Sequence, residues 1–110
     1  MAPQIDPNPG EKLILEEDCS EVKLGNGILS LTNQRIIFEK TEGNLTTLNK
    51  KIGNILLNSS LDKIGKVNSE GFILTKVVVE ISDSKYKFSV FNTGKWAKEI
   101  ENQKRLFKKN

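Results

Sequence analysis

The chain has 110 residues, of which 36% are hydrophobic and 28% charged, and its formal net charge is +3 at pH 7. This length supports one domain with a modest core, and the hydrophobic content excludes a disordered chain. The sequence contains no histidine and a single cysteine, Cys19. A lone cysteine forms no internal disulfide and holds no metal without other ligands. We therefore expect Cys19 to serve packing, and we expect neither a metal nor a cofactor.

The net charge hides an asymmetry between the two halves of the chain. Residues 1–49 carry four basic and eight acidic side chains, whereas residues 50–110 carry 13 basic and six acidic ones. Such a gradient orients a small protein in the field of an anionic partner more strongly than its mean charge suggests. The alternative is a lysine-rich surface that is only solvated.

Residues 1–11 are predicted to form a flexible leader outside the fold, and residues 12–110 are predicted to form the domain. All three prolines lie in this leader, and proline after Asp or Asn is typical of turns and loops. No stretch approaches the roughly 18 consecutive apolar residues of a membrane span, and the start lacks the pattern of a secretory signal. We expect a cytoplasmic protein that can associate peripherally with membranes.

Short β-rich runs separated by turn residues occupy the middle of the chain. The first hairpin is predicted where Asn26-Gly27 separates residues 22–24 from residues 28–31, because Asn-Gly between apolar alternations is a strong hairpin signal. Further strands are predicted at residues 35–39, 51–57, 61–67, 72–81 and 85–91.

The last two predicted strands differ in how clearly they define a buried face. In the strand from Lys85 to Phe91, large apolar side chains alternate with polar ones, so one face is expected in the core and the other in water. In the strand from Phe72 to Ile81 both faces are partly apolar. Its register therefore stays open.

A helical period replaces the alternation after Asn92. Trp96, Ile100 and Phe107 recur on one side of a helical wheel, and basic residues occupy the other side. This pattern predicts one amphipathic C-terminal helix, with Asn92 or Thr93 as its N-cap. Trp96 is large enough to plug the open end of a curled sheet.

About seven short strands and one helix predict a mainly β fold, in which a bent seven-stranded antiparallel sheet or partly open barrel is capped by the C-terminal helix. Residues 27–38, GILSLTNQRIIF, resemble the motif G-x-L-x-L-T-x-x-R-[LI]-I-[FW] of GRAM domains and their relatives, the bacterial PH-like domains and the GLUE domain of ESCRT trafficking machinery. Looser matches follow in the family's order at residues 55–64, 86–88 and 96–100. The resemblance spans residues 12–108 and implies a PH-like fold.

The motif contains one arginine, Arg35, in the polar turn between its two apolar segments. We expect Arg35 to be structural, either tying this turn through its five donors or lying along the sheet with its stem buried. A phosphate-binding role is the alternative.

Catalysis has little chemical support in the sequence. There is no histidine for acid–base work at neutral pH, no nucleophile with a nearby base and no glycine-rich phosphate loop. The run Glu16-Glu17-Asp18 is expected to lie in an exposed loop as solvated carboxylates. We therefore expect a non-catalytic binding module, with no small-molecule substrate.

Resemblance to PH-like modules implies an acidic phospholipid surface or a protein as the partner, and an adaptor role in membrane association or trafficking. The candidate anion-binding residues are Lys50, Lys51, Lys63, Lys66, Lys85 and Lys87. About four such lysines at an anionic membrane contribute about 4 kcal/mol, which gives only about millimolar affinity. Specificity for a phosphoinositide headgroup would require a shaped pocket.

The protein-partner alternative rests on an apolar stripe formed by Phe72, Leu74 and Val78. This stripe faces outward if Val77 and Val79 face the core, and it is itself core in the opposite register. Resemblance to GLUE domains implies ubiquitin as the natural candidate partner, with no lipid binding. Nucleic-acid binding is disfavoured, because the net charge is low and no basic face is interleaved with exposed aromatic residues.

Overall fold

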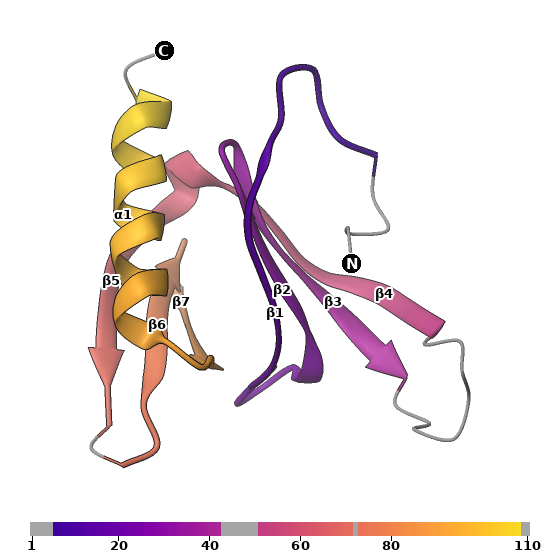
Figure 1. Cartoon of the computed structure of the whole chain (residues 1–110), viewed down its shortest axis with the longest axis vertical. Coiled ribbons are helices and arrows are strands. Elements are labelled where there is room, and N and C mark those ends of the chain that lie inside the picture. Colours follow the sequence, from indigo (N-terminus) through magenta and orange to yellow (C-terminus); the bar gives the residue numbers. More distant parts are fainter. Residues whose placement is uncertain (1–5, 43–50, 72, 109–110) are drawn as a thin grey trace.

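A computed structural model describes residues 6–42, 51–71 and 73–108, and in this part of the chain seven strands form one antiparallel sheet with a C-terminal helix beside it (Figure 1). The strands are β1 (Leu13–Glu21), β2 (Gly25–Thr32), β3 (Arg35–Glu42), β4 (Lys51–Ser60), β5 (Ile64–Glu70), β6 (Lys76–Ile81) and β7 (Ser84–Ser89). A 3-10 turn, η1 (Leu61–Lys63), joins β4 to β5, and the helix is α1 (Thr93–Lys108). Within these residues, no helix is long and apolar enough to cross a bilayer.

The sheet consists of two meanders joined through β1 and β7. Its strand order is β4-β3-β2-β1-β7-β6-β5, so β4 and β5 are its two edges and the sheet is not closed into a barrel. Strands β1 and β7 share two backbone pairs, Ser20↔Ser89 and Glu21↔Phe88. This short contact lets the two meanders bend toward each other, as Figure 1 shows, and the predicted bent sheet is confirmed.

The core fills the space between the two meanders and α1. Phe38 of β3 and Phe88 of β7 are fully buried, and their ring centroids lie 5.6 Å apart. From α1, Trp96 and Ile100 join the same cluster with exposures of 2% and 0%, so the predicted apolar stripe of the helix is confirmed. Asn92 Oδ1 accepts a hydrogen bond from the Lys95 backbone N–H at 3.0 Å and caps the helix.

The open question of the β6 register is answered by this core. Val77 and Val79 are fully buried members of the core cluster, together with Ile81. Because side chains alternate along a strand, Val78 and Glu80 project from the outer face of the sheet. The strand begins at Lys76 and is therefore shorter than predicted.

The first hairpin turns earlier than predicted. Asn26-Gly27 lies inside β2, and the turn consists of Val22-Lys23-Leu24. The Glu21 carboxylate fixes this turn, because its Oε1 accepts hydrogen bonds from the backbone N–H groups of Lys23 at 2.6 Å and Leu24 at 2.9 Å. A side-chain acceptor therefore outweighs the local Asn-Gly preference.

The motif that carries the family resemblance has a steric and a hydrogen-bonding basis. A Cβ on Gly27 would lie 2.3 Å from the carbonyl oxygen of Glu39, so only glycine fits where β2 approaches β3. The hydroxyl oxygen of Thr32 accepts hydrogen bonds from the backbone N–H groups of Gln34 at 3.0 Å and Arg35 at 2.9 Å. These bonds close the turn between β2 and β3.

Arg35 is structural, as predicted. Its Nε donates to Glu11 Oε2 at 2.8 Å and its Nη2 donates to Glu11 Oε1 at 2.9 Å, which makes a bidentate pair with side chains 12% and 3% exposed. The Arg35 Nη2 also donates to the carbonyl oxygen of Asp6, and the Gln34 side chain donates to that of Pro9. Residues 6–11 of the predicted leader thus contact the β2–β3 turn, while the domain boundary at residue 12 stays a prediction.

Ionised Glu11 is expected to stabilise the fold at neutral pH. Burial raises the pKa of this carboxyl group, but hydrogen bonds from Arg35, the Asn8 N–H and Thr32 outweigh burial and leave the pKa below its ordinary value of 4.5. Because the pKa is lower in the folded than in the unfolded chain, this stabilisation is present above the unfolded-state value and is lost as the pH falls through the folded-state value.

Glu11→Gln should therefore flatten the acid limb of the stability curve, measured as the free energy of urea unfolding from about pH 3 to about pH 7. Asp83→Asn, at an exposed position of the β6–β7 turn, is the matched control and should keep the wild-type dependence. Equal pH slopes for the wild-type chain and Glu11→Gln would contradict the prediction.

Candidate functional site

A cavity of about 360 Å³ opens on the outer face of β5, β6 and β7, on the opposite side of these strands from the core. We call it the outer groove. Its lining residues are Asn68, Ser69, Glu70, Val78, Glu80, Lys85 and Lys87.

Strand register explains why these side chains meet. Val78 of β6 lies opposite Asn68 of β5 on one side and Lys87 of β7 on the other. Glu80 lies opposite Lys85. Directly opposed residues project from the same face, and residues two apart along a strand share that face. Three strands therefore contribute neighbouring polar side chains around Val78, which is 6% exposed.

Both signs of charge line the outer groove. Lys87 Nζ lies 3.0 Å from Glu70 Oε2, and the two side chains are 38% and 52% exposed. A surface ion pair of this kind contributes at most about 1 kcal/mol, so a ligand can displace it. Lys85 is exposed and has no hydrogen bond or ion pair with the residues that the structure describes. The groove thus offers ammonium donors beside carboxylate, amide and hydroxyl groups.

Four of the predicted anion-binding lysines lie in or next to the strands that form the groove: Lys63, Lys66, Lys85 and Lys87. The last two line the groove, whereas Lys66 is exposed on β5 and Lys63 is exposed in η1, where β5 begins. Lys51 begins β4, at the opposite edge of the sheet, and Lys50 lies outside the described residues. The two groove carboxylates were not predicted, because only the strand register brings them beside the lysines.

The predicted apolar stripe does not form one continuous row on β6. Leu74 lies in the loop that precedes this strand and is 81% exposed, whereas Val78 is buried at the groove. Phe72 lies outside the described residues. Gly71 has a φ of +98°, and the chain leaves the extended conformation here before β6 begins at Lys76.

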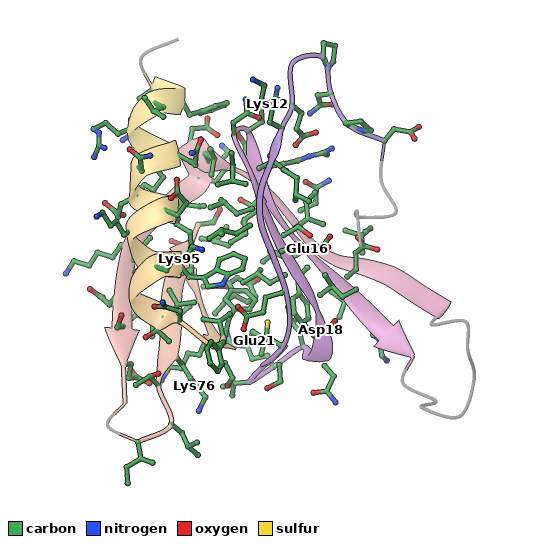
Figure 2. The ribbon with its side chains drawn as sticks, in the orientation of Figure 1. Lys12, Glu16, Asp18, Glu21, Lys76 and Lys95 are labelled. Carbon is green, nitrogen blue, oxygen red and sulfur yellow. The ribbon has the colours of Figure 1, made fainter. Side chains whose placement is uncertain are left out.

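The acidic run Glu16-Glu17-Asp18 lies in β1 and not in the exposed loop that was predicted. Glu17 accepts a hydrogen bond from Trp96 Nε1 at 2.9 Å and another from the backbone N–H of Phe91. The other two members of the run lie on the side of β1 that faces away from α1 (Figure 2). Glu17 therefore links the first strand to the C-terminal helix.

Cys19 follows this run and is only partly exposed. Burial, together with the negative charges of Glu17 and Asp18, raises the pKa of its thiol to about 12. The thiolate form is therefore scarce at neutral pH, and Cys19 is a poor nucleophile.

Comparison with known proteins supports the fold. No family model and no curated protein sequence matches the chain. Among solved structures, the chain is similar to the Vps36 N-terminal PH domain, with a TM-score of 0.65 and 20% sequence identity. The similarity covers 94% of this chain and 86% of that chain. The chain therefore has a PH-like fold, as the motif at residues 27–38 predicted.

Proposed function

We propose that the chain is a non-catalytic binding module that contacts anionic lipid headgroups through the outer groove and acts as an adaptor in membrane association. The observation that carries this proposal is the exposed ammonium group of Lys85 beside Lys87 in a polar cavity of about 360 Å³. Such a cavity provides the shape that scattered surface lysines lack.

The mixed charges of the groove favour a headgroup that carries both phosphate and free hydroxyl groups. The ammonium groups of Lys85 and Lys87 donate to phosphate oxygens. The carboxylates of Glu70 and Glu80 accept hydrogen bonds from ring hydroxyls, and Asn68 can both donate and accept. A ligand made of phosphate alone would meet these carboxylates unfavourably. A phosphoinositide headgroup therefore fits better than the headgroup of a simple anionic phospholipid.

A small protein such as ubiquitin is the second candidate partner. The supporting observation is the near-complete exposure of Leu74, because exposed large apolar side chains often mark contact surfaces. In this case, ubiquitin should shift the backbone amide resonances of Leu74 and Val78. Unchanged resonances at both positions would exclude this surface.

The double charge reversal Lys85→Glu/Lys87→Glu tests the lipid proposal. We expect it to weaken binding to phosphatidylcholine vesicles containing phosphatidylinositol phosphates at least about tenfold, because each lysine near an anionic surface contributes about 1 kcal/mol. Binding is measured by vesicle sedimentation, and circular dichroism checks the fold.

The control for this experiment reverses two charges away from the groove, at exposed positions of α1, with Lys98→Glu/Arg105→Glu. Binding that falls equally in both variants would show general electrostatic adsorption and remove the proposed site. A wild-type chain that binds no anionic vesicle would refute the lipid function and favour a protein partner.

A further inference from the structure

Two large apolar side chains protrude from the loop between β5 and β6. Ile73 is 90% exposed and Leu74 is 81% exposed. A Cβ on Gly71 would lie 2.4 Å from the carbonyl oxygen of Leu74, so the two sides of this loop approach each other closely at its base. The loop therefore presents its apolar residues from a tight hairpin, at the lower end of the molecule in Figure 1.

Two other segments expose apolar side chains at the same end. Phe91, between β7 and α1, is 95% exposed, and Val22, in the β1–β2 turn, is 66% exposed. The pair Val77↔Phe88 places the start of β6 beside the end of β7, and Figure 1 shows the β1–β2 turn, the β5–β6 loop and the β7–α1 connection at the lower end. These residues belong to three separate connections between elements.

Basic side chains accompany these apolar residues. Lys23, Lys76, Lys87 and Lys95 lie in or next to the three segments. Three acidic residues also lie there: Glu21 is buried with 2% exposure, Glu70 pairs with Lys87, and the half-buried Glu17 accepts hydrogen bonds from the backbone N–H of Phe91 and from Trp96 Nε1. Protruding apolar residues with lysines around them match the interface of an anionic bilayer, where ammonium groups meet the headgroups and apolar side chains enter the acyl boundary. This combination favours a lipid surface over a protein partner.

We propose that the β5–β6 loop inserts Ile73 and Leu74 into the interfacial region of an anionic lipid bilayer, beside the headgroup in the outer groove. Ser69 and Glu70 line the groove and directly precede the loop, so insertion brings the groove to the depth of the headgroups. This inference rests on the proposed lipid function. It adds an apolar contribution that salt does not screen.

Ile73→Ser/Leu74→Ser is expected to weaken sedimentation with phosphatidylcholine vesicles containing phosphatidylinositol phosphates by about tenfold to a hundredfold. Because the lost contribution is apolar, the ratio of the variant's vesicle affinity to that of the wild type should stay the same as the salt concentration is raised. The electrostatic contribution of the lysines decreases in both proteins. Leu106→Ser removes an apolar side chain that is 47% exposed near the C-terminal end of α1, and it should bind like the wild type.

Insertion depth is measured directly with an environment-sensitive fluorophore on Leu74→Cys in a Cys19→Ala chain. We expect a blue shift and protection from an aqueous quencher on the same vesicles, and neither effect for the label on Leu106→Cys. Insertion is refuted by a wild-type chain that binds the vesicles together with two further results: Ile73→Ser/Leu74→Ser binds as well as the wild type, and the label at position 74 stays in water. The groove proposal stands in that case. If the wild type binds no vesicle, both proposals fall.

Discussion

Trp96→Ala is expected to lower the free energy of unfolding by about 3–5 kcal/mol, the range typical of removing a large aromatic side chain from a core. Trp96 is 2% exposed and belongs to the cluster that joins α1 to both meanders. Its Nε1 also donates to Glu17 at 2.9 Å. The substitution therefore opens a cavity in the core, and the Glu17 carboxylate loses the indole N–H that donates to it.

Urea unfolding followed by circular dichroism measures this effect. Trp96→Phe keeps much of the apolar volume but loses the indole N–H, so its stability should lie between those of the wild type and Trp96→Ala. Lys98→Ala, at an exposed position of the same helix, is the control and should change stability by less than about 0.5 kcal/mol. A loss below about 1 kcal/mol for Trp96→Ala would show that α1 is not an integral part of the core.

Glu21→Ala is expected to destabilise the fold by about 3 kcal/mol, because it leaves three backbone donors without their acceptor. Glu21 Oε1 accepts from Lys23 and Leu24, and Oε2 accepts from the backbone N–H of Lys87 at 2.8 Å. The side chain thus holds the β1–β2 turn and also links β1 to β7, where the two meanders share few backbone pairs. Its loss affects the junction of the sheet.

The amide variant distinguishes these two bonding roles. In Glu21→Gln, the carbonyl oxygen still accepts from the β1–β2 turn, but the NH2 group faces the Lys87 N–H, donor against donor. Its stability should therefore be intermediate between those of the wild type and Glu21→Ala. Glu101→Gln, on α1 with a carboxylate side chain 51% exposed, should change little. Wild-type stability for Glu21→Ala would contradict the role of this carboxylate at the junction.

The elements that the sequence predicted well are those specified by local periodicity. The helical repeat alone predicts that Trp96 and Ile100 share one face of α1. The alternation of apolar and polar residues alone predicts that Phe88 lies on the core face of β7. The motif around Gly27 was recognisable because close approach to β3 excludes every larger residue at that position. Local periodicity thus predicted a bent sheet with one helix, and the resemblance of residues 27–38 to GRAM and GLUE domains implied the PH-like fold.

The errors arose where distant residues decide the local structure. The acidic run at residues 16–18 is in β1 because the backbone pairs with β2 and Glu17 bonds to Trp96, 79 residues away. The first turn was misplaced because the adjacent Glu21 carboxylate closes it, and this carboxylate is itself bonded to the backbone N–H of Lys87, 66 residues away. The outer groove could not be predicted either, since Glu70 and Lys87 become neighbours only through the pairing of β5, β6 and β7.

The central claim, that the outer groove holds a phosphorylated headgroup, is tested most directly by backbone amide spectra of the isotope-labelled chain titrated with soluble inositol bisphosphate. We expect saturable shifts at Asn68, Lys85 and Lys87, and no shift at Lys98 on the exposed face of α1. Unchanged resonances along β5, β6 and β7, or shifts confined to α1, would contradict the claim.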